Sequence, residues 1–486
     1  MYIKPSGEDQ ETDVVVIGTG PGGLSSVGSA VAAGAEVIAI EAHDNIGGNG
    51  LLSTGWVIFV DTPMQRSQNI QDSVDLFMKD CKKLVDESSL IYGLVWDEKL
   101  SRIFAENSAE MYEILTKRGV RFDRLIKRPL QTSVDRLAAV EDTKMFPAAF
   151  ERDFAGPHVK TYLQCSAQRL LVEDGVVKGV RVQPRDGSRS FIVRARKGVI
   201  LATGGYQANP ALRRHYQVDK TAMDIYPGLP TCRGDGHLLG QALGGDLVNM
   251  TMIPPIIAVA SHLTESAIAV NISGCRFHDE AGPYLDRVKA LEWQNQQKGF
   301  YIFDGKTFAD KRFYVDQMPG ERDSAATLEE LAAKIGVPGD ALTLSVQQWN
   351  NFLASGTDQE EGTGRVQFAP DRRGIIEAPF YSSPMISGVS LSVGGFVTTE
   401  TMQVVDVFGQ VIPGLFAVGD CAGGLTPTAE MGGTHLGGGF VLGWVAGRAA
   451  ATGQNSLPHT SATFGQSMDQ RVQMSGPIIN VAAAQI

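Results

Sequence analysis

A run of six residues, Gly18-Thr19-Gly20-Pro21-Gly22-Gly23, has the composition and spacing to bind the phosphates of a nucleotide. It directly follows Val14–Ile17, a β-branched stretch typical of a buried parallel strand, and it precedes an Ala- and Ser-rich helical stretch. In this arrangement Gly18 permits the turn, Gly20 lets a pyrophosphate approach the backbone, and Gly23 lets the helix pack closely on the sheet. The helix N-terminus then faces the phosphates and favours their negative charge.

A second predicted strand, residues 37–40, ends at Glu41-Ala42. The Glu41 carboxylate can accept hydrogen bonds from ribose hydroxyls, as an acid at the end of this strand does in dinucleotide-binding folds. We therefore expect Glu41 and Ala42 to contact the adenosine half of the nucleotide. The strand, glycines, helix and acid together indicate a dinucleotide site, but they do not distinguish FAD from NAD.

A second glycine-rich loop, residues 47–55, favours FAD over NAD. A nicotinamide-binding domain has no need of such a loop, whereas a flavoprotein can use one to pass along the ribityl chain and the ring. The sequence therefore predicts an FAD site, and the residues of this loop that we expect to contact the cofactor are Gly48, Asn49, Gly50, Ser53 and Gly55.

Segments far along the chain complete the predicted nucleotide site. Residues 197–205 read as a strand ending in glycines, and residues 409–420 read as a turn and a strand that end at Asp420. Ligands bind at the carboxyl ends of strands in open α/β sheets, so the Asp420 carboxylate can hold a ribityl hydroxyl. The further residues expected at the cofactor are Ala202, Thr203, Gly204, Asp235, Gly419 and Leu436. The predicted fold class is α/β, with a doubly wound, Rossmann-like domain built from both ends of the chain.

Seven signatures in the same order along the chain resemble the flavoprotein superfamily of fumarate reductases, succinate dehydrogenases and 3-ketosteroid dehydrogenases. They lie at residues 18–23, 47–55, 202–205, 234–236, 274–280, 413–420 and 431–437. The resemblance implies an FAD-binding domain formed by residues 1–244 and 390–486. An α+β capping domain, residues 245–389, would be inserted between these two parts, with the substrate between cap and flavin.

Three predictions about local structure accompany this division. Residues 327–335 and 341–352 read as helices within the cap, and residues 389–397 read as strand-like alternation where the chain leaves it.

The resemblance also implies a reaction type. The superfamily transfers hydride between flavin N5 and a carbon beside an activated carbonyl or carboxylate, while a proton moves on the adjacent carbon. Fumarate reductases hold a dicarboxylate with Arg and His side chains and deliver the proton from a cap arginine. At the three matching positions this chain has Tyr284, the histidine-free segment 390–395, and Glu430. Two like charges about 4 Å apart cost about 4 kcal/mol at an effective dielectric of 20, so fumarate is disfavoured.

Residues 279–284 instead resemble the Asn-Glu-x-x-Pro-Tyr segment of 3-ketosteroid dehydrogenases, whose tyrosine is a catalytic base. This resemblance implies that Tyr284 removes a proton in desaturation or donates one in the reverse ene-reduction. Arg287, one helical turn further on, could assist it. The family also binds the ketone oxygen with a backbone amide, which matches Gly433 at a predicted helix N-terminus.

The chain departs from the steroid pattern at Ala429, where that family has a second ketone-binding tyrosine. Glu430 or His435 could supply a replacement polar group. Structural interpretations stay open for each of these side chains: Tyr284 as an ordinary packed cap tyrosine, His435 as a loop histidine beside the flavin, and Glu430 as a helix cap. Trp56 and Tyr381 are candidate pocket aromatics, for which core packing is the alternative.

Composition limits the partners. A net charge of -11 over 486 residues disfavours nucleic acid and anionic membrane surfaces. Five scattered cysteines without CxxC, zinc or haem spacing predict reduced thiols and no metal site. No apolar run approaches the ~20 residues of a membrane span. The polar residues 1–13 lack the apolar stretch of a signal peptide, so we expect a cytoplasmic protein.

Three functional hypotheses follow. The first is a dehydrogenase that introduces a C=C bond next to a ketone, on a steroid-like or smaller ring, and uses non-covalent FAD. Asn49 supports non-covalent binding because covalent succinate dehydrogenase subunits carry a His there. The second is an ene-reductase acting on an α,β-unsaturated carbonyl or carboxylate, and the third is an electron-transfer or assembly subunit. Without a second dinucleotide fingerprint or a haem or iron–sulfur ligand set, the flavin needs an external electron acceptor or donor.

Overall fold

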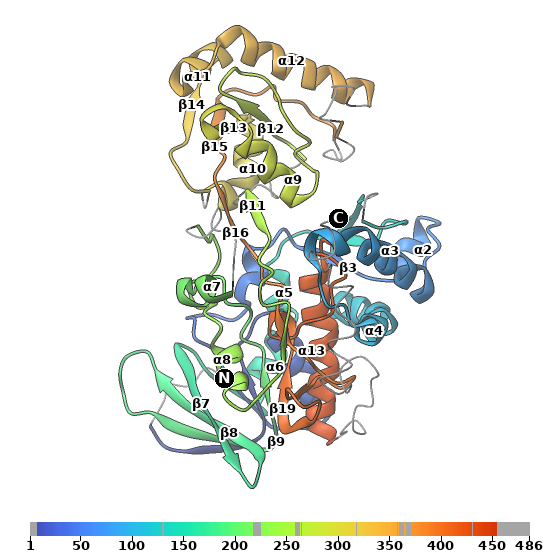
Figure 1. Cartoon of the computed structure of the whole chain (residues 1–486), viewed down its shortest axis with the longest axis vertical. Helices are drawn as coiled ribbons and strands as arrows, with labels where there is room; N and C mark the ends of the chain where they lie inside the picture. The colour runs from blue at the N-terminus through green and yellow to red at the C-terminus, as the bar shows by residue number, and fades with distance from the viewer. Residues whose placement is uncertain are drawn as a thin grey trace, which may run out of the picture.

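The computed structural model describes residues 7–128, 131–216, 225–257, 265–316, 318–356, 371–429 and 431–453, together with residues 263, 358, 364 and 365. These residues form two units stacked along the long axis of the molecule (Figure 1). The larger lower unit contains both the beginning of the chain and its last described helix. The smaller upper unit contains the middle of the chain, and we refer to it as the cap.

The lower unit is organised around an eight-stranded sheet. Its main path runs β18-β19-β9-β1-β2-β6, and β7 and β8 extend it through β9. The bounds are β1 (Gln10–Ile17), β2 (Val37–Ile40), β6 (Val159–Tyr162), β7 (Cys165–Glu173), β8 (Val176–Pro184), β9 (Phe191–Leu201), β18 (Gln403–Val405) and β19 (Val411–Ala417). The neighbours from β19 to β6 along this path pair in parallel. The predicted doubly wound α/β fold is confirmed, since β19 brings the late part of the chain into the sheet of β1.

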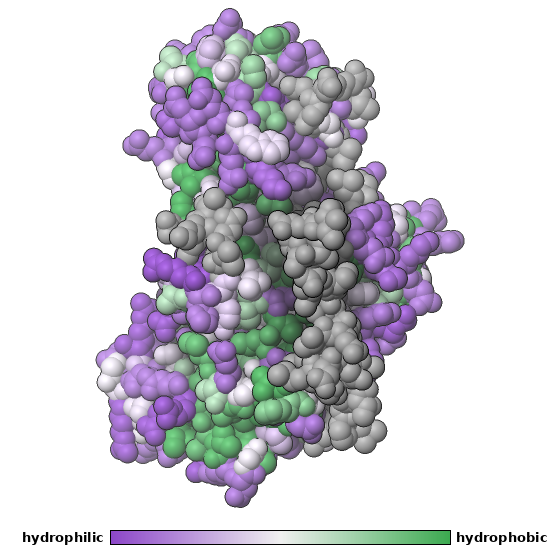
Figure 2. Space-filling view, in the orientation of Figure 1, coloured by the Kyte–Doolittle hydropathy of each residue, from purple (hydrophilic) through white to green (hydrophobic). Residues whose placement is uncertain are grey.

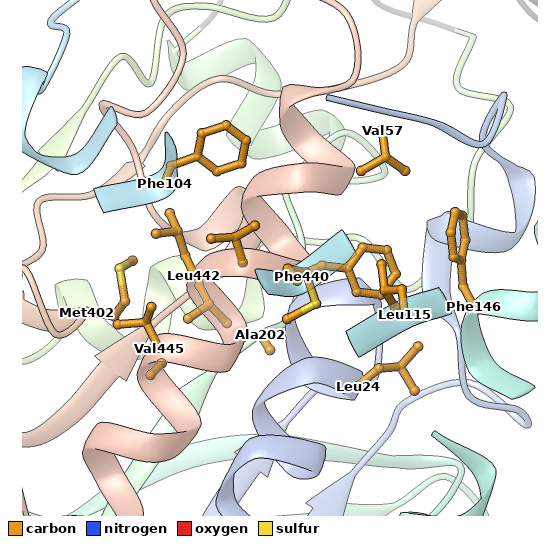
Figure 3. Close-up of a cluster of buried hydrophobic side chains, with 14 of the residues drawn as sticks. Leu24, Val57, Phe104, Leu115, Phe146, Ala202, Met402, Phe440, Leu442 and Val445 are labelled. Atoms are coloured by element: carbon orange, nitrogen blue, oxygen red, sulfur yellow. The ribbon is translucent and has the colours of Figure 1, made fainter. Parts of the chain in front are cut away.

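Helices α1 (Pro21–Ala32) and α13 (Thr434–Thr452) join the two ends of the chain directly. Three serine hydroxyls of α1 donate to backbone carbonyls of α13, the first from Ser25 to Phe440 at 2.5 Å. Glycines of α13 make this approach possible: a Cβ at Gly443 would lie 2.4 Å from the carbonyl oxygen of Gly22. Leu24 and Phe440 lie in the buried cluster between these helices and the sheet (Figure 3). The helix pair thus holds both parts of the lower unit together.

Further elements lie on the side of the lower unit that carries α2–α4 (Figure 1). A small antiparallel sheet has the order β3-β5-β4. The bounds here are β3 (Trp56–Ile58), β4 (Phe122–Ile126), β5 (Leu137–Val140), α2 (Pro63–Ser67), α3 (Val74–Tyr92) and α4 (Glu98–Lys117). Nearer the middle of the lower unit lie α5 (Met145–Ala148) and α6 (Glu151–Ala155) (Figure 1). Two other short helices, α7 (Pro210–Tyr216) and α8 (Asp235–Gln241), follow β9. This small sheet positions the segment that follows the second glycine-rich loop.

The cap is an antiparallel sheet, β12-β13-β15-β14, covered by helices. Its bounds are β12 (Ile268–Asn271), β13 (Gly299–Phe303), β14 (Asp323–Ala325), β15 (Phe380–Pro384), α9 (Tyr284–Glu292), α10 (Gly305–Val315), α11 (Leu328–Ile335) and α12 (Gly339–Ser355). The two helices predicted in this region are confirmed as α11 and α12. Hydrophilic residues dominate the visible surface of the cap, whereas hydrophobic residues gather over the lower unit on this face (Figure 2).

Two short antiparallel strand pairs connect the units. β11 (Pro255–Ile257) pairs with β16 (Ser387–Val389), and below it β10 (Leu247–Val248) pairs with β17 (Gly395–Phe396). The expectation of strand-like alternation throughout residues 389–397 was wrong, because β16 ends at Val389 and β17 starts only at Gly395. Between these two strands the backbone at Gly394 packs closely on the backbone at Met250, since a Cβ at Gly394 would lie 2.6 Å from the Cα of Met250. The domain boundaries at 245 and 389 stay a prediction.

Candidate cofactor and substrate site

A large cavity of about 300 Å³ opens at the carboxyl ends of the parallel strands and reaches the cap. Most of the residues predicted for the cofactor and substrate line it: Gly18, Gly20, Pro21, Gly22, Glu41, Ala42, Gly48, Asn49, Gly50, Ser53, Trp56, Ala202, Thr203, Gly204, Asp235, Tyr284, Gly419, Asp420, Gly433, His435 and Leu436. These residues come from both ends of the chain and from the cap. The fold therefore brings together groups that are more than 400 positions apart in sequence.

The nucleotide end of the cavity is shaped by the first glycine-rich turn. Gly18 has a φ of +94°, and a Cβ there would lie 2.3 Å from the carbonyl oxygen of Ala202, so only glycine fits. Gly20 has no atom within 4 Å of its Cβ position, which leaves its backbone open to a ligand. Gly23 does not line the cavity. A Cβ at Gly23 would lie 2.0 Å from the oxygen of Gly18, so this glycine serves the helix packing that was predicted for it.

Glu41 has a structural partner that the sequence did not indicate. Its Oε2 accepts hydrogen bonds from the backbone N–H and the hydroxyl of Thr19, at 2.8 and 2.7 Å, and its Oε1 accepts from the N–H of His43. The carboxylate thus braces the glycine-rich turn against the end of β2. An ionised carboxylate has about four acceptor positions, which leaves capacity for a ribose hydroxyl.

The second glycine-rich loop contains η1 (Gly48–Leu52), and Asn49 ties it to the segment 225–232. The Asn49 Nδ2 donates to the Tyr226 hydroxyl at 2.6 Å, while its Oδ1 accepts from the N–H of Leu229 at 2.8 Å. Burial raises the pKa of Tyr226, and it raises the pKa of Cys232 to about 12. Both of these cavity-lining groups are therefore protonated at neutral pH.

A further pair lies where η4 (Gly419–Cys421) meets the start of α13. The Nδ1 of His435 and the Oδ1 of Asp420 are 2.8 Å apart, and both residues line the cavity. Gly433, the N-cap of α13, has a φ of +80°. Its carbonyl accepts from Ile58, whereas its N–H donates to no acceptor in the part of the chain that the structure describes. The positive end of the helix and this amide together form a site for negative charge.

The cap contributes Ile256, Tyr284 and Tyr314 to the cavity wall. Tyr284 is the first residue of α9, directly after Pro283. The Arg287 guanidinium lies 4.8 Å from the centre of the Tyr284 ring, so Arg287 is close to Tyr284 but does not itself line the cavity. Burial raises the pKa of Tyr314, whose hydroxyl is hydrogen-bonded to Thr143 of the lower unit.

Other predicted site residues lie elsewhere. Tyr381 does not line the cavity: it stacks on Phe303 and Phe308 inside the cap, with ring centres 5.7 and 4.4 Å away. The alternative of core packing therefore describes Tyr381. Gly55 also lies behind the wall, since a Cβ there would meet Val140 at 2.4 Å. Glu430 lies outside the described residues.

Three aromatic or amide side chains at this site were not singled out from the sequence. Tyr226 and Tyr314 line the cavity, and the Oε1 of Gln131 accepts from the N–H of Gly432 at 3.2 Å. None of them belongs to one of the seven signatures, although Tyr226 lies eight residues before the signature at 234–236. No local spacing rule links such residues to a site, so only the tertiary structure identifies them.

These groups fit an FAD molecule. The cavity is continuous from the glycine-rich turn and Glu41, through the loop at Asn49, to Asp420 and the cap. Within the described residues, no group of three or more His, Cys, Asp or Glu side chains is arranged to hold a metal ion. None of the described helices combines the length and apolar character needed to cross a membrane.

The chain is similar in sequence to several known oxidoreductases. The chain is 27% identical to a probable fumarate reductase, Ifc3, of Shewanella frigidimarina, over 92% of this chain and 76% of that protein. It is 30% identical to the 3-oxosteroid 1-dehydrogenase of Mycobacterium tuberculosis, over 56% of this chain and 55% of that protein. A vinyl phenol reductase of Lactiplantibacillus plantarum is 28% identical over 92% of this chain and 98% of its own length.

Other relatives are longer. The chain spans about half the length of the NADH:fumarate oxidoreductase of Klebsiella pneumoniae and the NADH:acrylate oxidoreductase of Vibrio harveyi, with 47% and 50% covered. Among solved structures, the open conformation of a flavocytochrome c3 fumarate reductase superposes with a TM-score of 0.73 at 26% identity, covering 92% of this chain and 79% of that one. A 3-ketosteroid dehydrogenase from Rhodococcus jostii shares the fold, with a TM-score of 0.63 at 24% identity and 91% and 97% covered.

The family model of the FAD binding domain matches residues 13–436. That span contains both glycine-rich loops, the cap and the start of α13, so the predictions of FAD and of an oxidoreductase are confirmed. This chain belongs to the FAD binding domain family, as an FAD-dependent oxidoreductase related to the fumarate reductases and 3-oxosteroid dehydrogenases.

Proposed function

We propose that this chain is a dehydrogenase that introduces a C=C bond next to the ketone of a neutral ring, either steroid-like or smaller. One observation carries the proposal: Tyr284 and the free amide of Gly433 line the same cavity, and no Lys or Arg is among the described residues that line it. A dicarboxylate substrate would need cationic partners there to offset the loss of hydration. A ketone needs only a hydrogen-bond donor at its oxygen and a proton acceptor near the adjacent carbon.

Each residue has a defined task in this scheme. Bound FAD would supply the centre that accepts the hydride, which carries both electrons of the reaction. The Gly433 amide, at the positive end of α13, stabilises negative charge that develops on the ketone oxygen. Tyr284, as its phenolate, takes the proton from the neighbouring carbon and becomes the neutral phenol. The Arg287 guanidinium, 4.8 Å from the Tyr284 ring, lies close enough to favour the phenolate before that step. Trp56 forms an apolar part of the wall that a ring can contact.

A second candidate function is the reverse direction, reduction of an activated C=C bond. The vinyl phenol reductase favours it, because that relative matches this chain over 98% of its own length. A conjugated phenol would be neutral, like the ketone of the first proposal, so the same cavity suits it. In either direction the electrons come from or go to an external partner. The cytoplasmic location expected from the sequence stays a prediction.

The direction can be tested with the bound flavin itself. Oxidised holoenzyme is mixed anaerobically with cyclic ketones, steroids included, and with carboxylates, and bleaching of the flavin absorbance is followed. Reduced holoenzyme is mixed with enones and vinyl phenols, and return of the absorbance is followed. Bleaching by ketones alone supports the dehydrogenase, and reoxidation alone supports the ene-reductase. Bleaching by carboxylates alone would overturn the proposal that the substrate is neutral.

The role of Tyr284 is tested with Tyr284→Phe, and Tyr381→Phe is the matched control because Tyr381 lies in the cap away from the cavity. Loss of a positioned acid or base lowers turnover about 100- to 10,000-fold, so we expect a fall in that range for Tyr284→Phe only. Full turnover of Tyr284→Phe on every accepted substrate would rule out the assigned role.

The attachment of FAD is proposed to be non-covalent. By the resemblance drawn from the sequence, Asn49 stands where covalent succinate dehydrogenase subunits carry a His, and its amide is hydrogen-bonded to Tyr226 and Leu229. Acid precipitation of the holoenzyme should therefore leave all the flavin in the supernatant. Flavin that stays in the washed pellet would contradict this proposal.

A further inference from the structure

We propose that Arg128 is a positioning residue that couples docking of the cap to the placement of Tyr284. The inference rests on the proposed function, since it assumes that Tyr284 exchanges the proton. Arg128 follows β4 in the lower unit and is buried, with 7% of its surface exposed. Its Nη1 donates to the carbonyl oxygen of Ala281 at 2.8 Å, and Ala281 lies three residues before Tyr284 in the cap. One side chain of the lower unit thus holds the segment that carries the proposed base.

Arg128 also contacts the Trp56 ring, whose centre is 5.1 Å from the guanidinium carbon. Trp56 lines the cavity on the side of the lower unit, whereas Tyr284 lines it on the side of the cap. Arg128 therefore bridges two walls of the cavity from behind. A planar guanidinium can contact an aromatic ring while it donates in its plane, which an ammonium group does less well.

Within the cap, the residue before Ala281 is held by other arginines. The Glu280 carboxylate accepts from Arg276 at 2.7 and 2.9 Å and lies 3.3 Å from Arg365. The Glu280 carbonyl accepts from Arg287 at 3.2 Å. These contacts are internal to the cap and move with it. They fix the shape of the segment 280–284, and the contact of Ala281 with Arg128 ties that segment to the lower unit.

Two other polar contacts join the units without touching this segment. Arg124 pairs with Glu265 at 2.7 Å, and Tyr314 is hydrogen-bonded to Thr143. They can keep the cap near the lower unit when Arg128 is replaced. Loss of Arg128 should therefore misplace Tyr284 more than it detaches the cap, and a shift of about 1 Å at a reacting group can cost about 100-fold in rate.

A double-mutant cycle tests the coupling. We expect Arg128→Met to lower kcat about 10- to 100-fold and Arg128→Lys to retain part of the activity. In the Tyr284→Phe background, Arg128→Met should add no further loss, because the group it positions is already gone. Arg121→Met is the control, since exposed Arg121 pairs with Glu141 in the lower unit and should leave kcat unchanged. Full additivity of Arg128→Met and Tyr284→Phe would overturn the inference.

A distance measurement gives a readout that does not need turnover. Cys275 is the exposed cysteine of the five and lies in the cap, so a spin label there can be paired with one at Phe408→Cys, an exposed position of the lower unit. We expect Arg128→Met to broaden the distance distribution and Tyr284→Phe to leave it unchanged. An unchanged distribution in Arg128→Met would overturn the inference. Full turnover of Tyr284→Phe with a broadened distribution in Arg128→Met would instead show that the proposed function had failed.

Discussion

The contact between α1 and α13 and the contact between the cap and the lower unit are built in opposite ways. In the first, backbone meets backbone: Cβ atoms at Gly443 and Gly447 would lie 2.4 and 2.2 Å from the carbonyl oxygens of Gly22 and Ser26. In the second, long side chains reach across, as in the Arg124–Glu265 pair. The contact between α1 and α13 positions the glycine-rich turn and Gly433, which lie at the N-termini of these helices. The contact between the cap and the lower unit positions Tyr284, the first residue of α9.

The two kinds of contact suit two different requirements of the site, a constant geometry at the cofactor and access for the substrate. A close-packed backbone contact has one low-energy arrangement, so it keeps the groups at the two helix N-termini at a constant separation. Long polar side chains can break and re-form their contacts at small cost, which permits a substrate to enter beneath a cap. We therefore expect the cofactor side of the cavity to be rigid and the proposed substrate side to be adjustable. Substitutions in the two contacts should differ in what they change.

The largest effect is expected from Gly447→Val in α13. The added Cβ would lie 2.2 Å from the Ser26 carbonyl oxygen, and neither backbone can move without disturbing the sheet. We expect a loss of about 4 kcal/mol or more in the free energy of unfolding, or no folded protein. Denaturant titration and the flavin content of the purified protein would measure it. Gly339→Val is the matched control in α12, because a Cβ at Gly339 would meet ordinary contacts starting at 3.6 Å. Equal losses in both variants would contradict the comparison.

The cap should add a pH dependence of stability that the helix contact lacks. His278 is 5% exposed, and burial lowers its pKa to about 4, with Arg287, Arg276 and Arg365 lowering it and Glu280 partly opposing them. Between pH 6.5 and 4 the unfolded chain binds a proton that the folded cap does not, so stability falls as the pH falls through this window. The full effect is at most about 3 kcal/mol.

His278→Leu should reduce this slope, as measured by urea unfolding at several pH values, and buried His237 of the lower unit, whose pKa burial also lowers, accounts for a part that stays. His158→Gln is the control, because His158 is an exposed residue of the lower unit. Persistence of the full slope in His278→Leu would assign the pH dependence to other groups. At pH 7, His278→Leu should leave unchanged the urea concentration at which half of the bound FAD is released.

The sequence predicted the cofactor side of the cavity well, because its signals are local. The glycines of residues 18–23 must permit a turn and a close helix, and that constraint is visible within one strand and one helix. The predicted strand 37–40 has the bounds of β2, and α11 begins after Thr327, whose side chain accepts from the N–H of Glu330. Capping and β-branched runs act over a few residues, so they can be read from spacing alone.

The substrate side was less predictable because its contacts are non-local. Arg128 meets Ala281, 153 positions away, and nothing in the neighbourhood of either residue indicates the pair. Tyr381 was a candidate for the pocket, but a tyrosine suits a cap core equally well, and only its stacking on Phe308 decides between the two. The alternation predicted over residues 389–397 breaks because Gly394 must pass close to Met250, which a period of two does not reveal.

A third prediction separates holding the cap from positioning Tyr284. Arg124→Met removes one partner of the buried Glu265 carboxylate, which also lies near Lys311. The pair is partly exposed on the Arg124 side, so we expect only about a tenfold rise in KM, equivalent to about 1.4 kcal/mol, with kcat nearly unchanged. Steady-state kinetics with Arg121→Met as the control would measure it. A fall in kcat as large as that of Arg128→Met would mean that every cap contact positions the base.

The smallest effect is expected at Asn49, a polar side chain that holds a loop of the lower unit beside the flavin. Asn49→Ala removes the hydrogen bonds to Leu229 and Tyr226, so the loop beside the flavin loses its tie to the segment 225–232. A net loss of about 1 kcal/mol corresponds to about a fivefold rise in the Kd of FAD, measured by titrating apoprotein with FAD and following its fluorescence. Asn350→Ala removes an equivalent pair of bonds to Ile375 in the cap and should lower cap stability without changing that Kd. If Asn49→Ala released FAD as completely as Gly447→Val, the rigidity of the cofactor side would depend on its loops as much as on the contact between α1 and α13.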